Sequence, residues 1–154
     1  MKLKDFDFRI WDNIEKKYIE TPHGLYIENT EHNDASNCNR IIANYEQRAF
    51  YIDNPYDWKN KEYFNNENAF SIELFTGLYD KNGKKIYEGD ILYSFEGCSE
   101  GEAFKYKAVL KEGAFYLVEC GGDGEEYDED LISEFRLEEL EIVGNIHENA
   151  ELLK

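Results

Sequence analysis

Short runs in which apolar and polar side chains alternate constrain the fold of this chain more than any other feature. Such runs occur at residues 6–10 (FDFRI), 70–75 (FSIELF) and 104–110 (FKYKAVL). Successive side chains of a β-strand point to opposite faces, so alternation with a period of two predicts a strand with one buried face. The third run is followed by a Lys-Glu-Gly turn and by AFYLVE at residues 114–119, which predicts an antiparallel hairpin.

The many short strand signals define the expected fold class. They do not alternate with helical segments, so the sequence predicts no β-α-β units. We expect a mainly β protein in which short strands form small SH3-like or partly open barrels or curved sheets. A short C-terminal helix is expected to end the chain, with one helical turn at residues 148–153.

One further helix is predicted just before the last strand. Apolar residues spaced three and four apart within residues 131–140 indicate a short amphipathic helix, with Asp128 or Asp130 as its N-cap. The preceding residues, 120–130, are acidic and rich in glycine, and are expected to form a loop.

Composition along the chain indicates two regions. Residues 28–68 are polar and rich in Asn, apart from short apolar runs at 41–43 and 49–52, and are expected to be a variable insertion. We therefore predict an N-terminal β region at residues 1–70 and a C-terminal barrel-like region at residues 71–154. The sequence leaves open whether the aromatic-containing stretch after residue 52 is an ordered loop or a short helix.

The net charge of -17 limits the classes of partner. Such a chain repels the phosphates of nucleic acids and anionic membrane surfaces, so direct binding to either is not expected. No apolar run approaches the roughly 20 residues of a membrane span, and no secretory signal is visible. Three cysteines, an odd number, give no disulfide framework, which favours a reducing compartment such as the cytoplasm.

The negative charge is concentrated in one segment. Residues 119–141 contain eleven acids and a single base, Arg136, a net charge of -10. The segment lacks the spacing of an EF-hand, so a solvated acidic surface is favoured over a Ca²⁺ site. It is also a candidate partner-binding surface, formed by Asp123, Glu125, Glu126, Asp128, Glu129 and Asp130.

The sequence indicates no catalytic, cofactor-binding or metal-binding residues. The three histidines, His23, His32 and His147, do not have the local pairing of a structural zinc site with the cysteines. No serine lies in a nucleophile elbow, and no glycine-rich phosphate-binding pattern occurs. Clustered carboxylates that hold a divalent metal for hydrolysis remain a weaker alternative.

Three stretches resemble one known family. They are FRIWD at residues 8–12, TGLYDKNGKKIYEGDI at 76–91, and LEIVGNIHEN at 140–149 followed by Leu152 and Leu153. Together they are similar to the opening, the central motif and the ending of the YopX family of phage and prophage proteins. The chain departs from the family pattern at Ile10, where Ala is frequent, at His147, where Tyr is common, and at Ala150, where Pro is common.

The resemblance implies a mostly β protein encoded by a phage or prophage, with no established enzymatic activity. The matched positions are interpreted as scaffold, namely Gly77, Asn82, Gly83, Tyr87, Gly89, Asp90 and Gly144. The expected function is that of a non-enzymatic accessory protein that binds a protein partner or self-assembles. The alternative is an acidic decoy that mimics DNA and binds a basic host protein.

Overall fold

The structure is a computed structural model of the 154-residue chain. It describes residues 5–19, 24–28, 40–45, 48–51, 68, 70–96 and 102–154, with only the backbone described in 24–28, 40–45 and 48–51. The chain divides into two compact units: unit 1 comprises Met1–Arg9 and Glu73–Lys154, and unit 2 comprises Ile10–Ile72. Among the described residues, no helix has the length and apolar character needed to cross a membrane.

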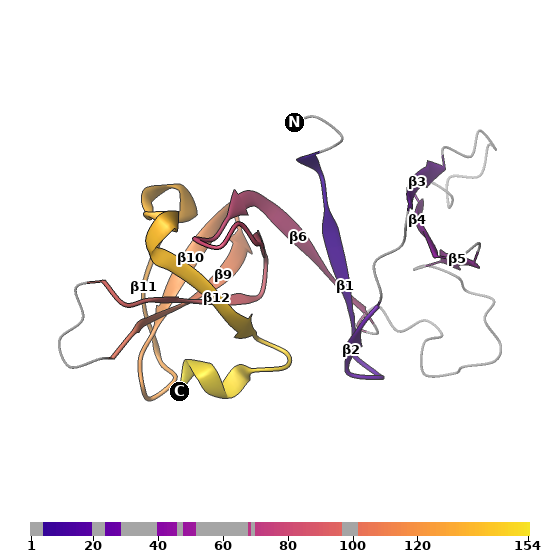
Figure 1. The fold of residues 1–154 in the computed structure, drawn as a ribbon. Helices are drawn as coiled ribbons and strands as arrows, with labels where there is room; N and C mark the ends of the chain where they lie inside the picture. The colour runs from indigo at the N-terminus through magenta and orange to yellow at the C-terminus, as the bar shows by residue number, and fades with distance from the viewer. Residues whose placement is uncertain are drawn as a thin grey trace. The chain divides into compact units, whose positions relative to one another are not determined.

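Unit 1 is built on a five-stranded antiparallel sheet with the order β11-β10-β9-β8-β12 (Figure 1). The strands are β8 (Asp90–Ser94), β9 (Phe104–Lys111), β10 (Ala114–Cys120), β11 (Glu126–Leu131) and β12 (Leu140–Asn145). The predicted hairpin is confirmed, with Ala114 opposite Lys111 and Cys120 opposite Lys105. The sheet curls, which confirms a mainly β fold with curved sheets.

Alternate residues of these strands form the hydrophobic core of unit 1. Leu92, Ala108 and Leu117 are at most 1% exposed and lie on adjacent strands. Ile86 of β7 (Lys85–Tyr87) is fully buried against them. Fully burying a side chain of the size of Leu or Ile contributes about 1.5–3 kcal/mol, so this row of side chains stabilises the curled sheet.

The predicted helix over residues 131–140 is wrong. This segment contains two single 3₁₀ turns, η3 (Ile132–Glu134) and η4 (Leu137–Glu139). Phe135 lies between them in extended conformation and packs edge-on against Tyr106, with ring centroids 5.2 Å apart. The tertiary contacts of Ile132 and Phe135 outweigh a helical signal that covered fewer than three turns.

The expected loop at residues 120–130 is also partly wrong. Residues 126–131 form strand β11, which pairs with β10 and follows a tight turn at 121–125. Strand propensity is low for acids, so this strand has little signal in the sequence. Lys107 and Lys111 of β9 form ion pairs with Glu126 and Glu129, which offsets the charge of the strand. Asp128 and Asp130 are therefore strand residues and not helix caps.

The chain ends in a 3₁₀ turn, η5 (Ala150–Leu153), which confirms the expected helical turn near the C-terminus. The Tyr93 hydroxyl donates a hydrogen bond to the Leu152 carbonyl at 2.7 Å. The Lys105 ammonium donates to the Lys154 carbonyl, also at 2.7 Å. These bonds hold the turn over the face of the sheet that carries Tyr93 and Lys105.

A second sheet has the order β2-β1-β6-β7. Its strands β1 (Phe8–Asp12) and β6 (Phe70–Tyr79) continue from one unit into the other, since the unit boundaries fall inside them. In unit 2, β1 pairs with β2 (Lys17–Tyr18), and the rings of Trp11 and Tyr18 lie 4.9 Å apart.

Unit 2 also contains a three-stranded antiparallel sheet, β3-β4-β5. Its strands are β3 (Gly24–Glu28), β4 (Arg40–Tyr45) and β5 (Arg48–Tyr51). The apolar run at 41–43 lies in β4, and most of the run at 49–52 lies in β5. His23, His32 and the stretch 52–67 lie outside the described residues. The division into domains at residues 1–70 and 71–154 stays a prediction.

Candidate functional site

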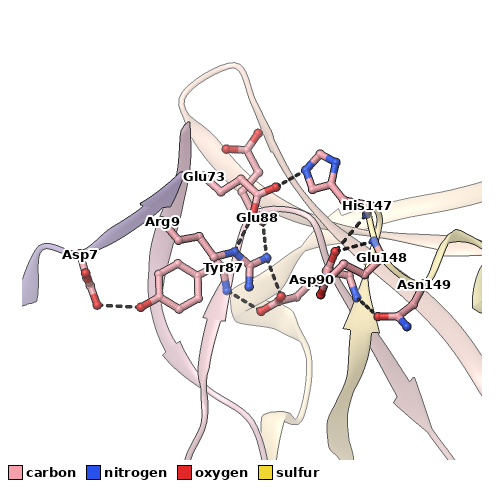
Figure 2. Close-up of polar contacts among 10 residues, drawn as sticks. Asp7, Arg9, Glu73, Tyr87, Glu88, Asp90, His147, Glu148 and Asn149 are labelled. Carbon is pink, nitrogen blue, oxygen red and sulfur yellow. Dashed lines mark hydrogen bonds and ion pairs between the residues drawn. The ribbon is translucent and has the colours of Figure 1, made fainter. Parts of the chain in front are cut away.

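The main cluster of ionisable side chains in unit 1 is centred on Arg9 of β1 (Figure 2). The neighbours of Arg9 in the strand, Phe8 and Ile10, are buried, and the alternation of the strand turns Arg9 to the other face. The Arg9 Nε lies 2.5 Å from the Glu73 Oε2, and the Arg9 Nη2 lies 2.7 Å from the Asp90 Oδ1. One guanidinium therefore bridges two carboxylates that are 5% and 3% exposed.

The second oxygen of Glu73 contacts a histidine from the C-terminal segment. The Glu73 Oε1 lies 2.6 Å from the His147 Nε2. Glu73 thus stands between Arg9 and His147, as Figure 2 shows. The three residues come from β1, β6 and the turn after β12, so the cluster joins the beginning, middle and end of the chain.

Asp90 is held by the turn between β7 and β8. Its Oδ2 accepts a hydrogen bond from the Tyr87 N–H at 2.8 Å, and the Glu88 carbonyl accepts one from the Arg9 Nη2 at 3.1 Å. Gly89 in this turn has φ +83°, and a Cβ there would lie 2.9 Å from the Glu73 Oε1. Glycine is therefore favoured at residue 89, both for its backbone conformation and for the close approach of Glu73.

Asp7 forms a second anchor for the N-terminal segment. Its Oδ2 accepts hydrogen bonds from the Lys85 Nζ and the Tyr87 Oη, each at 2.6 Å. The Arg9 guanidinium also lies 4.9 Å from the centroid of the Tyr87 ring, a cation–π arrangement. The two polar side chains of the segment, Asp7 and Arg9, are thus fixed by the TGLYDKNGKKIYEGDI motif.

The electrostatics of the cluster follow from burial and from these partners. Burial raises the pKa of Asp90 above its ordinary value, and the Arg9 charge limits the rise. Burial and the nearby Glu73 raise the pKa of Glu88. Burial also acts to raise the pKa of Asp7, but the hydrogen bonds from Lys85 and Tyr87 outweigh it and lower the pKa. Arg9 thus stabilises the ionised form of Asp90, and Lys85 and Tyr87 stabilise that of Asp7.

The turn after β12 positions His147. The Asn145 Oδ1 accepts hydrogen bonds from the backbone N–H groups of His147 and Glu148, each at 3.0 Å. The Asn149 Oδ1 approaches Gly144 so closely that a Cβ at residue 144 would lie 2.5 Å from it. The residues of the ending VGNIHEN thus define one tight turn that directs the imidazole to Glu73.

Asp80 of the same central motif closes the outer edge of β12. Its Oδ1 accepts from the N–H groups of Asn82 and Lys84, each at 2.9 Å, and its Oδ2 accepts from the Ile142 N–H at 3.1 Å. Burial acts to raise the pKa of Asp80, but these three donors lower it below the usual range. Gly77 of the motif lies in β6, and Asn82 and Gly83 lie in the turn whose N–H groups bind the Asp80 side chain.

The acidic residues singled out from the sequence lie at the opposite edge of the sheet. Asp123 and Glu125 lie in the turn at 121–125, where the Asp123 Oδ1 accepts from the Glu125 N–H at 3.0 Å. The other four belong to β11 and are Glu126, Asp128, Glu129 and Asp130. Within the described residues, no group of three or more His, Cys, Asp or Glu side chains is placed to hold a metal ion.

Strand β11 is the outermost strand of the five-stranded sheet, and all six of its residues are exposed. Asp130 lies opposite the buried Leu117, and Leu131 lies opposite Tyr116 on the other face. In the described part of the chain, no strand pairs with the outer edge of β11. The two edges of the sheet therefore differ. At the β12 edge the Asp80 side chain accepts a hydrogen bond from the strand, whereas the β11 edge is a charged strand without a neighbouring strand in the described part of the chain.

The sequence did not indicate the cluster around Arg9. The family motif marks Asp90 and Tyr87 only as scaffold, and Glu73 belongs to an alternating run whose apolar residues are expected to be buried. The structure buries Glu73 at 4% exposure and leaves the adjacent Ile72 40% exposed. A signal did exist, since Arg9 and His147 both lie inside the motifs at the two ends of the chain.

The comparisons with known proteins agree with these motifs. No curated protein matches the chain. The crystal structure of protein EF1440 from Enterococcus faecalis is similar to it, with 26% sequence identity, a TM-score of 0.58 and coverage of 97% of this chain and 98% of that chain. The family model described as YopX protein matches residues 7–154. The chain therefore belongs to the YopX family.

Proposed function

We propose that this chain is a non-enzymatic accessory protein of a phage or prophage, which acts in the cytoplasm of the bacterial host by binding another protein. The observation that carries the proposal is strand β11, which is exposed on both faces and is the outermost strand of its sheet. A strand usually gains stability by burying one face, and β11 does not. Its exposed edge offers backbone donors and acceptors to a partner.

The charges of β11 restrict the partner. Lys107 and Lys111 form ion pairs with Glu126 and Glu129, while no described residue forms a hydrogen bond or ion pair with the side chains of Asp128 and Asp130. A second copy of this edge would bring like charges together, which disfavours pairing. We therefore expect the partner to present an extended segment with Lys or Arg near Asp130 and an apolar residue beside Leu131.

The ionisable side chains of the buried cluster around Arg9 bind one another, which favours a structural role for them over a catalytic one. The Arg9 guanidinium and the Glu73 and Asp90 carboxylates contact one another within the cluster. Burial raises the pKa of the Cys120 thiol, which disfavours a thiolate nucleophile. These observations favour binding over catalysis.

The second candidate is an acidic decoy that imitates DNA, and the concentration of acids in the β11 hairpin favours it. Four acids over the six residues of β11 correspond to about one charge per 5 Å, given a rise of about 3.3 Å per residue. Double-stranded DNA carries about one charge per 1.7 Å of axis. Because the strand has about a third of that density, we place the peptide-binding edge first.

The test uses a peptide of about ten residues that alternates Lys and Val, with two controls of the same length. One control replaces Lys with Glu, and the other carries two internal prolines, which remove the strand geometry. We expect the Lys–Val peptide alone to bind, and Asp128→Lys with Asp130→Lys to weaken binding by about tenfold. The matched variant Glu134→Lys with Glu138→Lys changes charge equally on exposed residues outside the strand, and leaves binding unchanged.

Two outcomes would contradict the proposal. Equal binding of the proline-containing peptide indicates charge attraction without strand pairing, which favours the decoy. Turnover in a broad hydrolase screen that a single substitution abolishes would show that the protein is an enzyme.

A further inference from the structure

We infer that residues 10–72 are an insertion in unit 1. We also infer that the ion pair between Arg9 and Glu73, here called the clasp, holds the two chain segments of unit 1 together at the insertion point, independently of the insertion. The chain leaves unit 1 after Arg9 and returns to it at Glu73. The side chains of these two residues form an ion pair with a distance of 2.5 Å between the Arg9 Nε and the Glu73 Oε2. The last residue before the insertion therefore binds the first residue after it.

Backbone contacts support the same closure. The Phe75 N–H donates a hydrogen bond to the Asp7 carbonyl at 2.9 Å, so the outgoing and returning strands pair inside unit 1. The Glu88 N–H donates to the Leu74 carbonyl at 3.0 Å, which ties the returning strand to the turn before β8. All of these atoms belong to unit 1.

The clasp is also anchored to the rest of unit 1. The Arg9 Nη2 contacts the Asp90 Oδ1 at 2.7 Å, and the Glu73 Oε1 contacts the His147 Nε2 at 2.6 Å. Glu73 and Asp90 side chains are 5% and 3% exposed. Ion pairs of this kind resist opening, because removing one partner leaves a buried charge without compensation. The connection points are thus fixed by unit 1 itself.

This arrangement predicts that the two units open separately in the full chain. Opening of one compact unit exposes its own amides to exchange, while the amides of an independent unit stay protected. Damage to unit 2 should therefore leave the exchange of β8, β9 and β10 unchanged. Damage to the clasp should raise the exchange of β7, β8 and the part of β6 after Glu73, whose residues contact Arg9 and Glu73.

The experiment measures amide hydrogen exchange by mass spectrometry in three variants of the full chain. Trp11→Ala removes a ring that is 3% exposed and packs against Tyr18 within unit 2. Arg9→Met removes the clasp, and Arg136→Met removes an exposed ion pair with Glu139 as a matched control.

We expect Trp11→Ala to accelerate exchange in β2 by at least about a hundredfold, with β8, β9 and β10 within about twofold of the native chain. Arg9→Met should accelerate exchange in β7, β8 and the part of β6 after Glu73 by at least about a hundredfold, and Arg136→Met should not. Equal acceleration of β2 and β8–β10 in Trp11→Ala would overturn the inference, as would global unfolding of that variant. Unchanged exchange of unit 1 in Arg9→Met would overturn the role of the clasp.

Discussion

Replacing Arg9 by Met tests how much the buried cluster contributes to stability. Met retains much of the length and apolar stem of Arg, so the substitution removes the charge and its hydrogen bonds and little of the packing. The Arg9 side chain is 21% exposed, and its two carboxylate partners are 5% and 3% exposed. Removing one partner of a buried ion pair typically costs about 3–5 kcal/mol, and here one guanidinium serves two carboxylates. We expect a loss of about 3–5 kcal/mol in the free energy of unfolding at about pH 7.

The loss should depend on pH in a defined direction. The pKa of Asp90 is already raised by burial, and Arg9 acts to lower it. Removing Arg9 raises this pKa further, so the folded variant takes up a proton at a higher pH than the unfolded chain. A raised pKa contributes stability below the unfolded value and loses it as the pH rises through the folded value. The difference between the variant and the native chain should therefore shrink as the pH falls from neutral towards the ordinary carboxyl range.

The measurement is urea unfolding of both proteins at about pH 7 and about pH 4.5, with Arg136→Met as the control at an exposed ion pair. Arg9→Lys is informative as well, because a single ammonium does not reproduce the fork that reaches both carboxylates. A loss below about 1 kcal/mol at neutral pH would show that Arg9 contributes no more than an exposed ion pair does. A loss of equal size at both pH values would contradict the expected rise in the pKa of Asp90.

Three further predictions concern single contacts. Gly89→Ala should lower the free energy of unfolding, measured in urea, by about 2–3 kcal/mol. Gly77→Ala should lower it by about 1 kcal/mol, because Gly77 has a similar φ but no atom within 4 Å of its Cβ position. Equal losses would contradict the contact between residue 89 and the buried Glu73 carboxylate. Asp80→Ala should cost about 2–4 kcal/mol at neutral pH and less in acid, because a lowered pKa contributes stability that is lost as the pH falls through the folded value. The same cost in acid would contradict this. Lys107→Ala with Lys111→Ala should accelerate amide exchange in β11 more than in β8, and unchanged exchange would show that the ion pairs do not hold the strand.

Local patterns in the sequence predict the strands in which every second side chain is buried. The hairpin of β9 and β10 follows directly from the period of two in FKYKAVL and AFYLVE. Gly83 and Gly89, which the central motif marks as scaffold, have φ angles of 76° and 83°, a backbone conformation that other residues disfavour. These signals are local, and the structure confirms mainly β elements where they occur.

Elements that depend on distant contacts could not be predicted in this way. β11 has almost no apolar residues, and its lysine partners lie 18 and 19 residues earlier in the chain. Glu73 is buried because Arg9 and His147 meet it, at sequence separations of 64 and 74. No pattern within a single strand reveals such a meeting, so the candidate site around Arg9 emerged only from the structure.

Amide hydrogen exchange of β11 in the native chain, followed residue by residue by NMR, shows whether the outer edge of this strand is open to a partner. In a strand that is paired on one side only, successive N–H groups point alternately to the partner and to solvent. We expect alternating slow and fast exchange along Asp128–Leu131, against uniformly slow exchange in β10, which is paired on both sides. Uniformly slow exchange would show that another surface covers this edge, and uniformly fast exchange would show that β11 is not a stable strand. Either result would contradict an open edge as the binding surface.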